Sequence, residues 1–273
     1  MIVDGKAIAA DIYAELAPHF KAFPRKVRLG IVVVGENPVI ESFVRIKTRS
    51  AERLGIEMVR TNLPDTATTA DVVAAVKRAV EETDAVIAQL PLPAGRQGFP
   101  GVDTNAVLSV IPKDKDVDAL NPTVPDDMRS VFAPVALASI EILKRNGVQI
   151  KGGRAVVVGA GRLVGAPAAW LLKRLGADVS VFSLQHGSIE DLKDADIIVS
   201  GAGNPGFIKP DRIKKGVALI DAGTSELNKK ISGDADPACA DKASVFTPVP
   251  GGVGPVAVAM IFRNLLELLR KRG

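Results

Sequence analysis

Buried strands alternate with amphipathic helices along this chain, and this alternation restricts the fold more than any other feature. Leu29 to Val34 is an apolar run rich in β-branched residues, which is typical of a strand buried on both faces in a parallel sheet. A helix is expected to follow, with Asn37 as its N-cap, Pro38 in its first turn and Gly55 after its end. The expected elements that continue the pattern are strands at 56–62 and 85–89 and a helix at 70–83. The first part of the chain is therefore predicted to form a parallel α/β sheet, with ligands outside the carboxyl ends of its strands.

A second alternation begins at Arg154. Its expected elements are strands at 155–158, 179–182, 197–200 and 217–221 and a helix at 164–175. A chain of 273 residues suits two α/β lobes, because domains usually hold about 100–200 residues. Further helices are expected at 7–20, at 136–145 between the lobes, and at 256–270. The last helix is predicted to pack back on the first lobe, which would make that lobe discontinuous. Residues 95–101 are expected to form an exposed loop without chemistry.

The composition excludes several classes of protein. Hydrophobic residues make up 47% and charged residues 24% of the chain, which argues against a disordered or fibrous protein. The longest apolar stretch is far shorter than the roughly 20 residues of a membrane-spanning helix, and no secretory signal pattern is present. Cys239 is the single cysteine, so an intramolecular disulfide is excluded and a cytoplasmic location fits. Two histidines and one cysteine argue against a metal site.

The charge distribution argues against a nucleic-acid partner. The net charge is +4, but lysine and arginine are spread along the expected helices, and aromatic residues make up only 4% of the chain. A mild positive balance instead indicates tolerance for anionic small molecules.

Glycines punctuate the turn after the first strand of the second lobe, at Gly159, Gly161 and Gly165. Such a turn between a strand and a helix can hold a pyrophosphate on helix N-terminal amides, although it can also be a tight turn without a ligand. A preference for NAD usually places an acid at the end of the next strand, and that strand ends without one. NADP and NAD therefore both stay open, and Arg162 or His186 could meet a 2′-phosphate.

Candidate catalytic residues lie in the first lobe. Phe43 and Lys47 are four residues apart, so a ring and an amine project from the same helix face. A desolvated lysine can exchange protons near neutral pH, although a solvated surface lysine is the commoner case. Gln89 ends a strand and precedes the stiff Pro91-Leu92-Pro93 segment. Asp116 and Asp118 alternate in an extended segment, so only one of them can face a cleft.

Proline and glycine are concentrated from Thr247 to Pro255. This run predicts a stiff loop that presents backbone groups to a ligand, and the alternative is an ordinary connector before the last helix.

Four motifs together resemble the bifunctional methylenetetrahydrofolate dehydrogenase/cyclohydrolase family, over essentially the whole chain. The family's Tyr-Val-x-x-Lys appears as Phe43 to Lys47, its Gln-Leu-Pro-Leu-Pro as Gln89 to Pro93, and its Lys-Asp-Val-Asp-Gly as Lys115 to Ala119. Its Pro-Gly-Gly-Val-Gly-Pro loop is intact at Pro250 to Pro255.

The resemblance implies an oxidoreductase and hydrolase of one-carbon metabolism that uses NADP, or alternatively NAD, on a tetrahydrofolate derivative. It implies a folate-binding catalytic domain at 1–133, completed by helix 256–273, a Rossmann-like NAD(P)-binding domain at 134–255, and a homodimer built through the nucleotide lobe. Lys47 would handle protons in the cyclohydrolase step, Gln89 would hold Lys47 and the folate in register, and Asp118 would hydrogen-bond the pterin. The remaining expected substrate contacts are Phe43, Pro91, Gly251, Gly252, Gly254 and Pro255, and the expected cofactor contacts are Gly159, Ala160, Gly161, Arg162, Gly165 and Thr224.

The chain also departs from the family pattern. Phe43 replaces a tyrosine, and Gly159-Ala160-Gly161 stands where Gly-Arg-Ser favours a 2′-phosphate. Alternatives are an NAD-dependent dehydrogenase without efficient cyclohydrolase activity, a folate- or nucleotide-binding protein without turnover, and a different two-lobe oxidoreductase resembling shikimate dehydrogenase. The intact Pro250 to Pro255 loop argues against the last.

Overall fold

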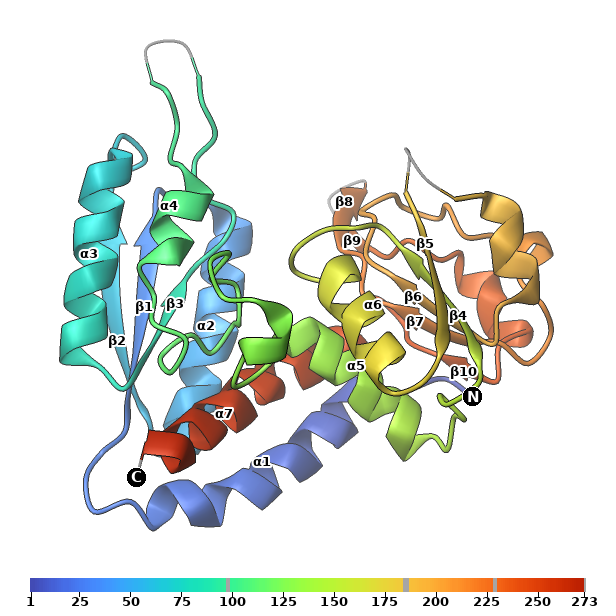
Figure 1. The fold of residues 1–273 in the computed structure, drawn as a ribbon, viewed down its shortest axis with the longest axis horizontal. Helices are drawn as coiled ribbons and strands as arrows, with labels where there is room; N and C mark the ends of the chain where they lie inside the picture. Colours follow the sequence, from blue (N-terminus) through green and yellow to red (C-terminus); the bar gives the residue numbers. More distant parts are fainter. Residues whose placement is uncertain (97–98, 184–186, 228–229, 273) are drawn as a thin grey trace. The chain divides into compact units, whose positions relative to one another are not determined.

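The structure is a computed structural model that describes residues 1–96, 99–183, 187–227 and 230–272 (Figure 1). His186 and the tip of the 95–101 loop lie outside the described residues. The chain divides into two compact units, each with its own parallel sheet. The three-stranded unit comprises Ile12–Phe132 and Ile261–Gly273, and the five-stranded unit comprises Met1–Asp11 and Ala133–Met260.

The three-stranded unit is built on a sheet with the strand order β2-β1-β3. Its strands are β1 (Arg28–Val34), β2 (Glu57–Leu63) and β3 (Ala85–Ala88), and its helices are α2 (Pro38–Arg53), α3 (Thr69–Glu82) and α4 (Thr104–Ser109). Figure 1 shows α2 and α3 on opposite faces of this sheet. Apolar side chains of α3 and α4 pack with alternate residues of β1 and β3 into one core, which includes Val32, Val72, Val76, Val86 and Val107.

The predicted ends of α2 are confirmed. The Asn37 side chain accepts hydrogen bonds from the amides of Val39 and Ile40, at 2.9 and 3.3 Å, and Pro38 occupies the first turn. Gly55 follows the helix with a φ of +73°, a left-handed conformation that glycine adopts without strain. In contrast, α4 was not expected, because its six residues are too few for a helical period to stand out in the sequence.

The five-stranded unit has the strand order β10-β7-β6-β4-β5, and its strand pairs are all parallel. The strands are β4 (Arg154–Val158), β5 (Asp178–Phe182), β6 (Ile197–Ser200), β7 (Ala218–Asp221) and β10 (Val245–Phe246); the helices are α5 (Pro134–Arg145) and α6 (Gly165–Arg174). A short antiparallel hairpin, β8 (Ser225–Leu227) and β9 (Lys230–Ser232), was not expected from the sequence. The first residues of the chain extend the sheet at β10, where the amide of Val3 donates to Phe246 at 2.8 Å.

Two long helices complete the chain, α1 (Gly5–Lys21) and α7 (Val253–Arg272). The predicted packing of the last helix on the first lobe is confirmed: Asn264 of α7 donates to the carbonyls of Val117 and Phe132, at 2.7 and 2.8 Å. The expected start of this helix at residue 256 is wrong, since Gly254 and Pro255 lie in its first turn. Proline fits there because first-turn amides have no partner within the helix.

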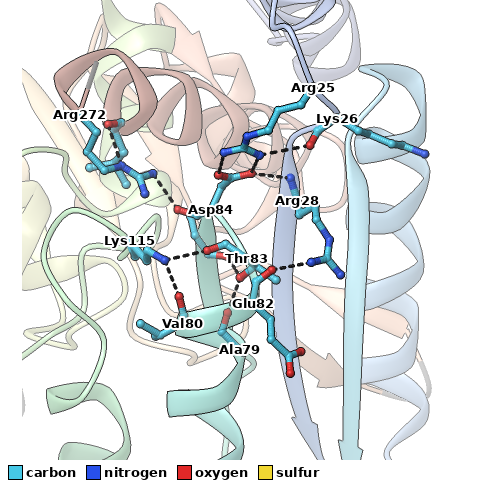
Figure 2. A network of polar contacts seen from close by, with 12 residues as sticks. Arg25, Lys26, Arg28, Ala79, Val80, Glu82, Thr83, Asp84, Lys115 and Arg272 are labelled. Carbon is cyan, nitrogen blue, oxygen red and sulfur yellow. Dashed lines mark hydrogen bonds and ion pairs between the residues drawn. The ribbon is translucent and has the colours of Figure 1, made fainter.

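A polar network joins the end of α3 to β1 and to the last turn of α7 (Figure 2). The last turn of α3 contains no basic residue, and cations from elsewhere bind its carbonyls. Lys115 donates to Val80 and Thr83, and Arg28 donates to Glu82. Such donors satisfy carbonyls that a helix end leaves free, and they complement its dipole.

Asp84 is the acidic centre of this network (Figure 2). Its buried carboxylate binds the Arg25 guanidinium through two hydrogen bonds and accepts a third from the Arg28 amide at 2.8 Å. The Arg272 guanidinium donates to the backbone carbonyl of Asp84 at 2.7 Å. Burial opposes ionisation of Asp84, but the hydrogen bonds from Arg25 and Arg28 outweigh burial and lower the pKa of the carboxyl.

Replacing Asp84 by Asn should lower the free energy of unfolding by about 2 kcal/mol, because charge-assisted hydrogen bonds to a buried group are lost. Because the folded-state pKa is depressed, this contribution is present above the ordinary pKa near 3.8 and disappears as the pH falls through the folded value. Urea denaturation followed by circular dichroism at a series of pH values from 7 down to the acid limit of the folded protein would measure both effects. Asp65→Asn, at the exposed Asp65–Arg96 ion pair, is the matched control and should change little. Equal shifts in the two variants would contradict the assignment.

Candidate functional site

The amine of Lys47 is bound to a fixed amide. Lys47 lies in the middle of α2, and its Nζ donates to Oε1 of Gln89 at 2.8 Å. Gln89 follows β3 directly, is 7% exposed, and uses its own Nε2 to donate to the Leu90 carbonyl at 2.7 Å. The second bond orients the amide so that its oxygen faces the amine. The structure thus brings together two of the residues that the sequence selected.

Burial and a neighbouring charge act on Lys47 in opposite directions. Desolvation lowers the pKa of Lys47, and the Asp118 carboxylate partly offsets this by favouring the ammonium form. Desolvation likewise raises the pKa of Asp118, and Lys47 opposes that shift. An amine with a depressed pKa, held by a neutral amide and near a carboxylate, loses its proton more readily than a solvated lysine does and can exchange protons with a ligand.

Asp116 and Asp118 have different partners, but the segment that holds them forms turns and not the extended conformation expected from the sequence, since the Ala119 amide donates to the Asp116 carbonyl at 3.2 Å. Asp116 is 3% exposed, and its carboxylate accepts a hydrogen bond from the Asn121 amide at 2.8 Å. This hydrogen bond closes the turn from Asp116 to Asn121. Burial raises the pKa of Asp116 to about 6, with the Asn121 hydrogen bond acting against that shift. Asp118 is the carboxylate that interacts with Lys47.

Arg129 holds the same turn and was missed by sequence reasoning. Its guanidinium donates to the carbonyls of Ala119 and Asn121, at 2.8 and 3.0 Å. Ala119 has a φ of +55°, which costs an alanine roughly 1 kcal/mol, so these bonds stabilise an unfavourable conformation. No sequence signal links an arginine to a turn eight to ten residues before it.

Phe43 and Pro91 remain available for contact with a ligand. Phe43 lies one helical turn before Lys47 and is 38% exposed, and Pro91 is also exposed. Tyr13, the only tyrosine of the chain, is buried and donates to Ser50 at 2.9 Å, so its hydroxyl is already engaged.

The glycine turn of the five-stranded unit, from Gly159 to Gly165, brings the backbone of its two end residues into close contact. Gly159 has a φ of +96°, and a Cβ on Gly165 would lie 1.9 Å from the Gly159 carbonyl oxygen. Residues Ala160, Gly161 and Arg162 are exposed between them, and α6 starts at Gly165 with no side-chain cap from Val164. Helix amides without a side-chain cap, behind an exposed glycine turn, suit an anionic phosphate. Thr224 is exposed just beyond the carboxyl end of β7.

The proline- and glycine-rich loop spans Thr247 to Gly252 and packs on the start of the chain. Gly251 has a φ of +108°, and its carbonyl accepts the Gly5 amide at 3.0 Å. A Cβ on Gly5 would lie 1.8 Å from the Gly252 carbonyl oxygen, so this contact requires glycine. Gly254 and Pro255 belong to the helix and not to the loop. Sequence reasoning missed Gly5, since a single glycine near the start of a chain carries no signal.

Two further properties concern the described residues only. No group of three or more His, Cys, Asp or Glu side chains among them is arranged to hold a metal ion. None of the helices seen in these parts of the chain combines the length and apolar character needed to cross a membrane.

Comparison with known proteins places both units in one family. The family model for the catalytic domain of tetrahydrofolate dehydrogenase/cyclohydrolase matches residues 3–118, and the model for its NAD(P)-binding domain matches residues 133–273. Bifunctional protein FolD of Methanoculleus marisnigri is 38% identical, in an alignment that covers 100% of this chain and 97% of the relative.

Solved structures agree with the sequence matches. Bifunctional FolD of Campylobacter jejuni is 29% identical with a TM-score of 0.90, over 100% of this chain and 99% of that one. Trypanosoma brucei FolD, solved with NADP and an inhibitor, is 31% identical with a TM-score of 0.90, over 100% and 98% of the two chains. With two family models covering nearly all of its length, this chain belongs to the tetrahydrofolate dehydrogenase/cyclohydrolase family.

Proposed function

We propose that this protein oxidises 5,10-methylenetetrahydrofolate to 5,10-methenyltetrahydrofolate with NADP and then hydrolyses the methenyl form to 10-formyltetrahydrofolate. Membership of the family supports both steps. The observation that carries the proposal for this chain is the 2.8 Å hydrogen bond from the Lys47 amine to Gln89, with Asp118 as the neighbouring charge.

The two steps are assigned to different parts of the chain. Residues 1–133, with helix residues 256–273, are proposed to bind the folate through Phe43, Pro91 and Asp118. Residues 134–255 are proposed to bind the dinucleotide. The relatives bear names of bifunctional enzymes, and one of them was solved with NADP.

The glycine turn fits the pyrophosphate of NADP. Gly159 and Gly165 pack so closely that a Cβ at either position would meet a carbonyl oxygen within 3 Å, and the start of α6 lies directly behind the exposed residues 160–162. When bound, NADP accepts the hydride from the one-carbon bridge of the folate. This step needs alignment of donor and acceptor more than a protein nucleophile.

Hydrolysis of the methenyl cation needs a proton acceptor, and Lys47 is proposed for this role. A charged ammonium would repel the cationic substrate, whereas a desolvated neutral amine can take a proton from attacking water and return it later. Gln89 holds the amine in place in both protonation states, because its oxygen accepts from either form.

An NAD-dependent dehydrogenase with weak cyclohydrolase activity is the second candidate. Phe43 lacks the hydroxyl of the family tyrosine, and Ala160 and Gly161 lack the arginine and serine that favour a 2′-phosphate. One assay separates the candidates: methylenetetrahydrofolate is supplied with NADP or NAD, and reduced nicotinamide and methenyl product are followed together. Reduced cofactor without methenyl accumulation supports both activities with that cofactor, and accumulation of both products supports the dehydrogenase alone. No reaction with either cofactor would contradict the proposal.

We further propose a cytoplasmic homodimer associated through the five-stranded unit. The single cysteine, Cys239, is buried, and burial raises its thiol pKa to about 11, which suits a protein without disulfides. Sedimentation of the purified protein at micromolar concentration tests the assembly, and a monomer under these conditions would contradict it.

Replacing Lys47 by Ala should slow hydrolysis of methenyltetrahydrofolate by about 100-fold or more, because a general acid–base group is lost. Lys47→Arg should be equally slow, since a guanidinium stays charged. Arg49→Ala on the exposed side of the same helix is the matched control. Full cyclohydrolase turnover in Lys47→Ala would rule out the assigned role.

The pH dependence of cyclohydrolase activity should follow Lys47. The neutral amine is the active form, so the rate should rise with pH and level off above the lowered pKa of Lys47, below its ordinary 10.5. Because Asp118 favours the ammonium form, Asp118→Asn should move this rise to lower pH at saturating substrate. A rise in the wild type at pH 10.5 or higher, or an unchanged position in Asp118→Asn, would argue against this mechanism.

Replacing Gly165 by Ala should weaken NADP binding by about tenfold or more and lower the melting temperature, because the new Cβ collides with the Gly159 carbonyl. Gly161→Ala, where a Cβ meets nothing within 4 Å, should leave the melting temperature unchanged. Calorimetric titration and thermal denaturation provide the two measurements. Wild-type affinity in Gly165→Ala would show that the turn does not bind the cofactor.

A further inference from the structure

Two buried carboxylates lie close together in the five-stranded unit, outside the turn from Gly159 to Gly165 and the loop from Thr247 to Gly252. Asp221 ends β7 and Asp234 follows β9, and each is 1% exposed. Among the residues that the structure describes, no lysine, arginine or histidine forms an ion pair with either acid; backbone amides and the Ser200 hydroxyl bind them instead. The positions of the hydrogen-bond donors show which segment each carboxylate holds.

Asp234 holds the segment that follows β6. Its Oδ2 accepts the Ser200 hydroxyl at 2.6 Å and the Ala202 amide at 2.8 Å, and its Oδ1 accepts the Asn204 amide at 2.7 Å. Each carboxylate oxygen is therefore directed at a protein donor. The segment from Ser200 to Asn204 is fixed at three points.

Asp221 holds the segments after β7 and after β9. Its Oδ1 accepts the amides of Gly223 and Asp234, at 2.9 and 3.1 Å, and its Oδ2 accepts the Ala235 amide at 2.8 Å. Burial raises the pKa of Asp221 to about 6, and the three amides only partly offset desolvation.

Gly223 and Gly233 allow the two acids to pack closely, because each glycine contacts the acid on the other segment. A Cβ on Gly223 would lie 2.3 Å from Cγ of Asp234, and a Cβ on Gly233 would lie 2.2 Å from Oδ2 of Asp221. Each acid thus packs against a glycine beside the other acid. Substitution of either glycine would push the two segments apart.

The held segments lie beside the proposed cofactor contacts. Strands β4, β6 and β7 are adjacent and parallel, so their carboxyl ends share one edge of the sheet. Gly159 packs so closely on Gly201 that an added Cβ would lie 2.9 Å from the Gly201 carbonyl oxygen. Thr224 follows Gly223, and Ser225 donates to the Gly203 carbonyl at 2.9 Å, which joins the two segments.

We infer that Asp221 and Asp234 are positioning residues for the dinucleotide, which set the segments 200–204 and 222–225 in the conformation that NADP binds. The inference rests on the proposed function. Neither acid has to touch the cofactor, because their oxygens are engaged by protein donors.

The test compares an activity that uses the cofactor with one that does not. Asp234→Asn replaces an acceptor oxygen by an NH2 group that faces amide donors, so the Kd and KM for NADP should rise by about tenfold or more. Hydrolysis of supplied methenyltetrahydrofolate, which needs no cofactor, should keep its wild-type kcat and KM. Ser200→Ala removes a single donor and should raise the Kd for NADP in the same direction by a smaller factor. Asp241→Asn, an exposed site in the same unit, is the matched control.

Each outcome decides the inference. It is overturned if folded Asp234→Asn and Ser200→Ala bind NADP as the wild type does. It is also overturned if both variants lose cyclohydrolase activity together with NADP binding, since the acids would then be general stabilisers. A wild type without turnover refutes the proposed function only, because the Kd for NADP still tests the inference. A wild type that binds neither NADP nor NAD refutes both.

Discussion

Parallel strand pairing is the constraint on which the rest of the structure depends. Each pairing within the two main sheets is parallel, so the carboxyl ends of neighbouring strands meet at one edge. In the three-stranded unit this edge carries Gln89, and in the five-stranded unit it carries Gly159 and Asp221. Residues distant in the sequence are gathered in this way within each unit. The loops at these edges then need partners for their free backbone groups.

Charged side chains bind free backbone groups in both units. In the three-stranded unit, Lys115, Arg129 and Arg272 donate to free carbonyls at a helix end and in turns. In the five-stranded unit, Asp221 and Asp234 accept free amides after strands. The sign of each charge matches the backbone group that it binds, because carbonyls accept from cations and amides donate to carboxylates. Charged side chains thus define loop geometry in both units.

The sequence predicted the features that depend on local chemistry. Asn37 and Gly55 mark the ends of α2 because capping and left-handed glycine are local effects. The partnership of Lys47 and Gln89 was predicted from a family motif. Strand β3, which Gln89 follows, pairs with β1, which α2 follows, so the two side chains lie 2.8 Å apart although 42 residues separate them in the sequence. The roles of Gly5, Arg129 and Asp234 were not predicted, because each binds backbone outside its own helix, strand or turn, where no periodic or capping pattern marks the contact. Helix α7 begins at Val253 and not at the expected residue 256, because its first turn accommodates Gly254 and Pro255.

Ala119 restricts the backbone conformation of the turn that carries Asp118. Glycine would reach the same φ of +55° freely, but it would also sample many other conformations. Alanine has far fewer accessible states, and Asp116 and Arg129 hold it in a costly one. The backbone next to Asp118 is consequently stiff rather than pliant. With alanine at this position, the Asp118 carboxylate should move over a narrower range of distances from the Lys47 amine than it would with glycine. The electrostatic effect of Asp118 on the pKa of Lys47 should then vary less with thermal motion.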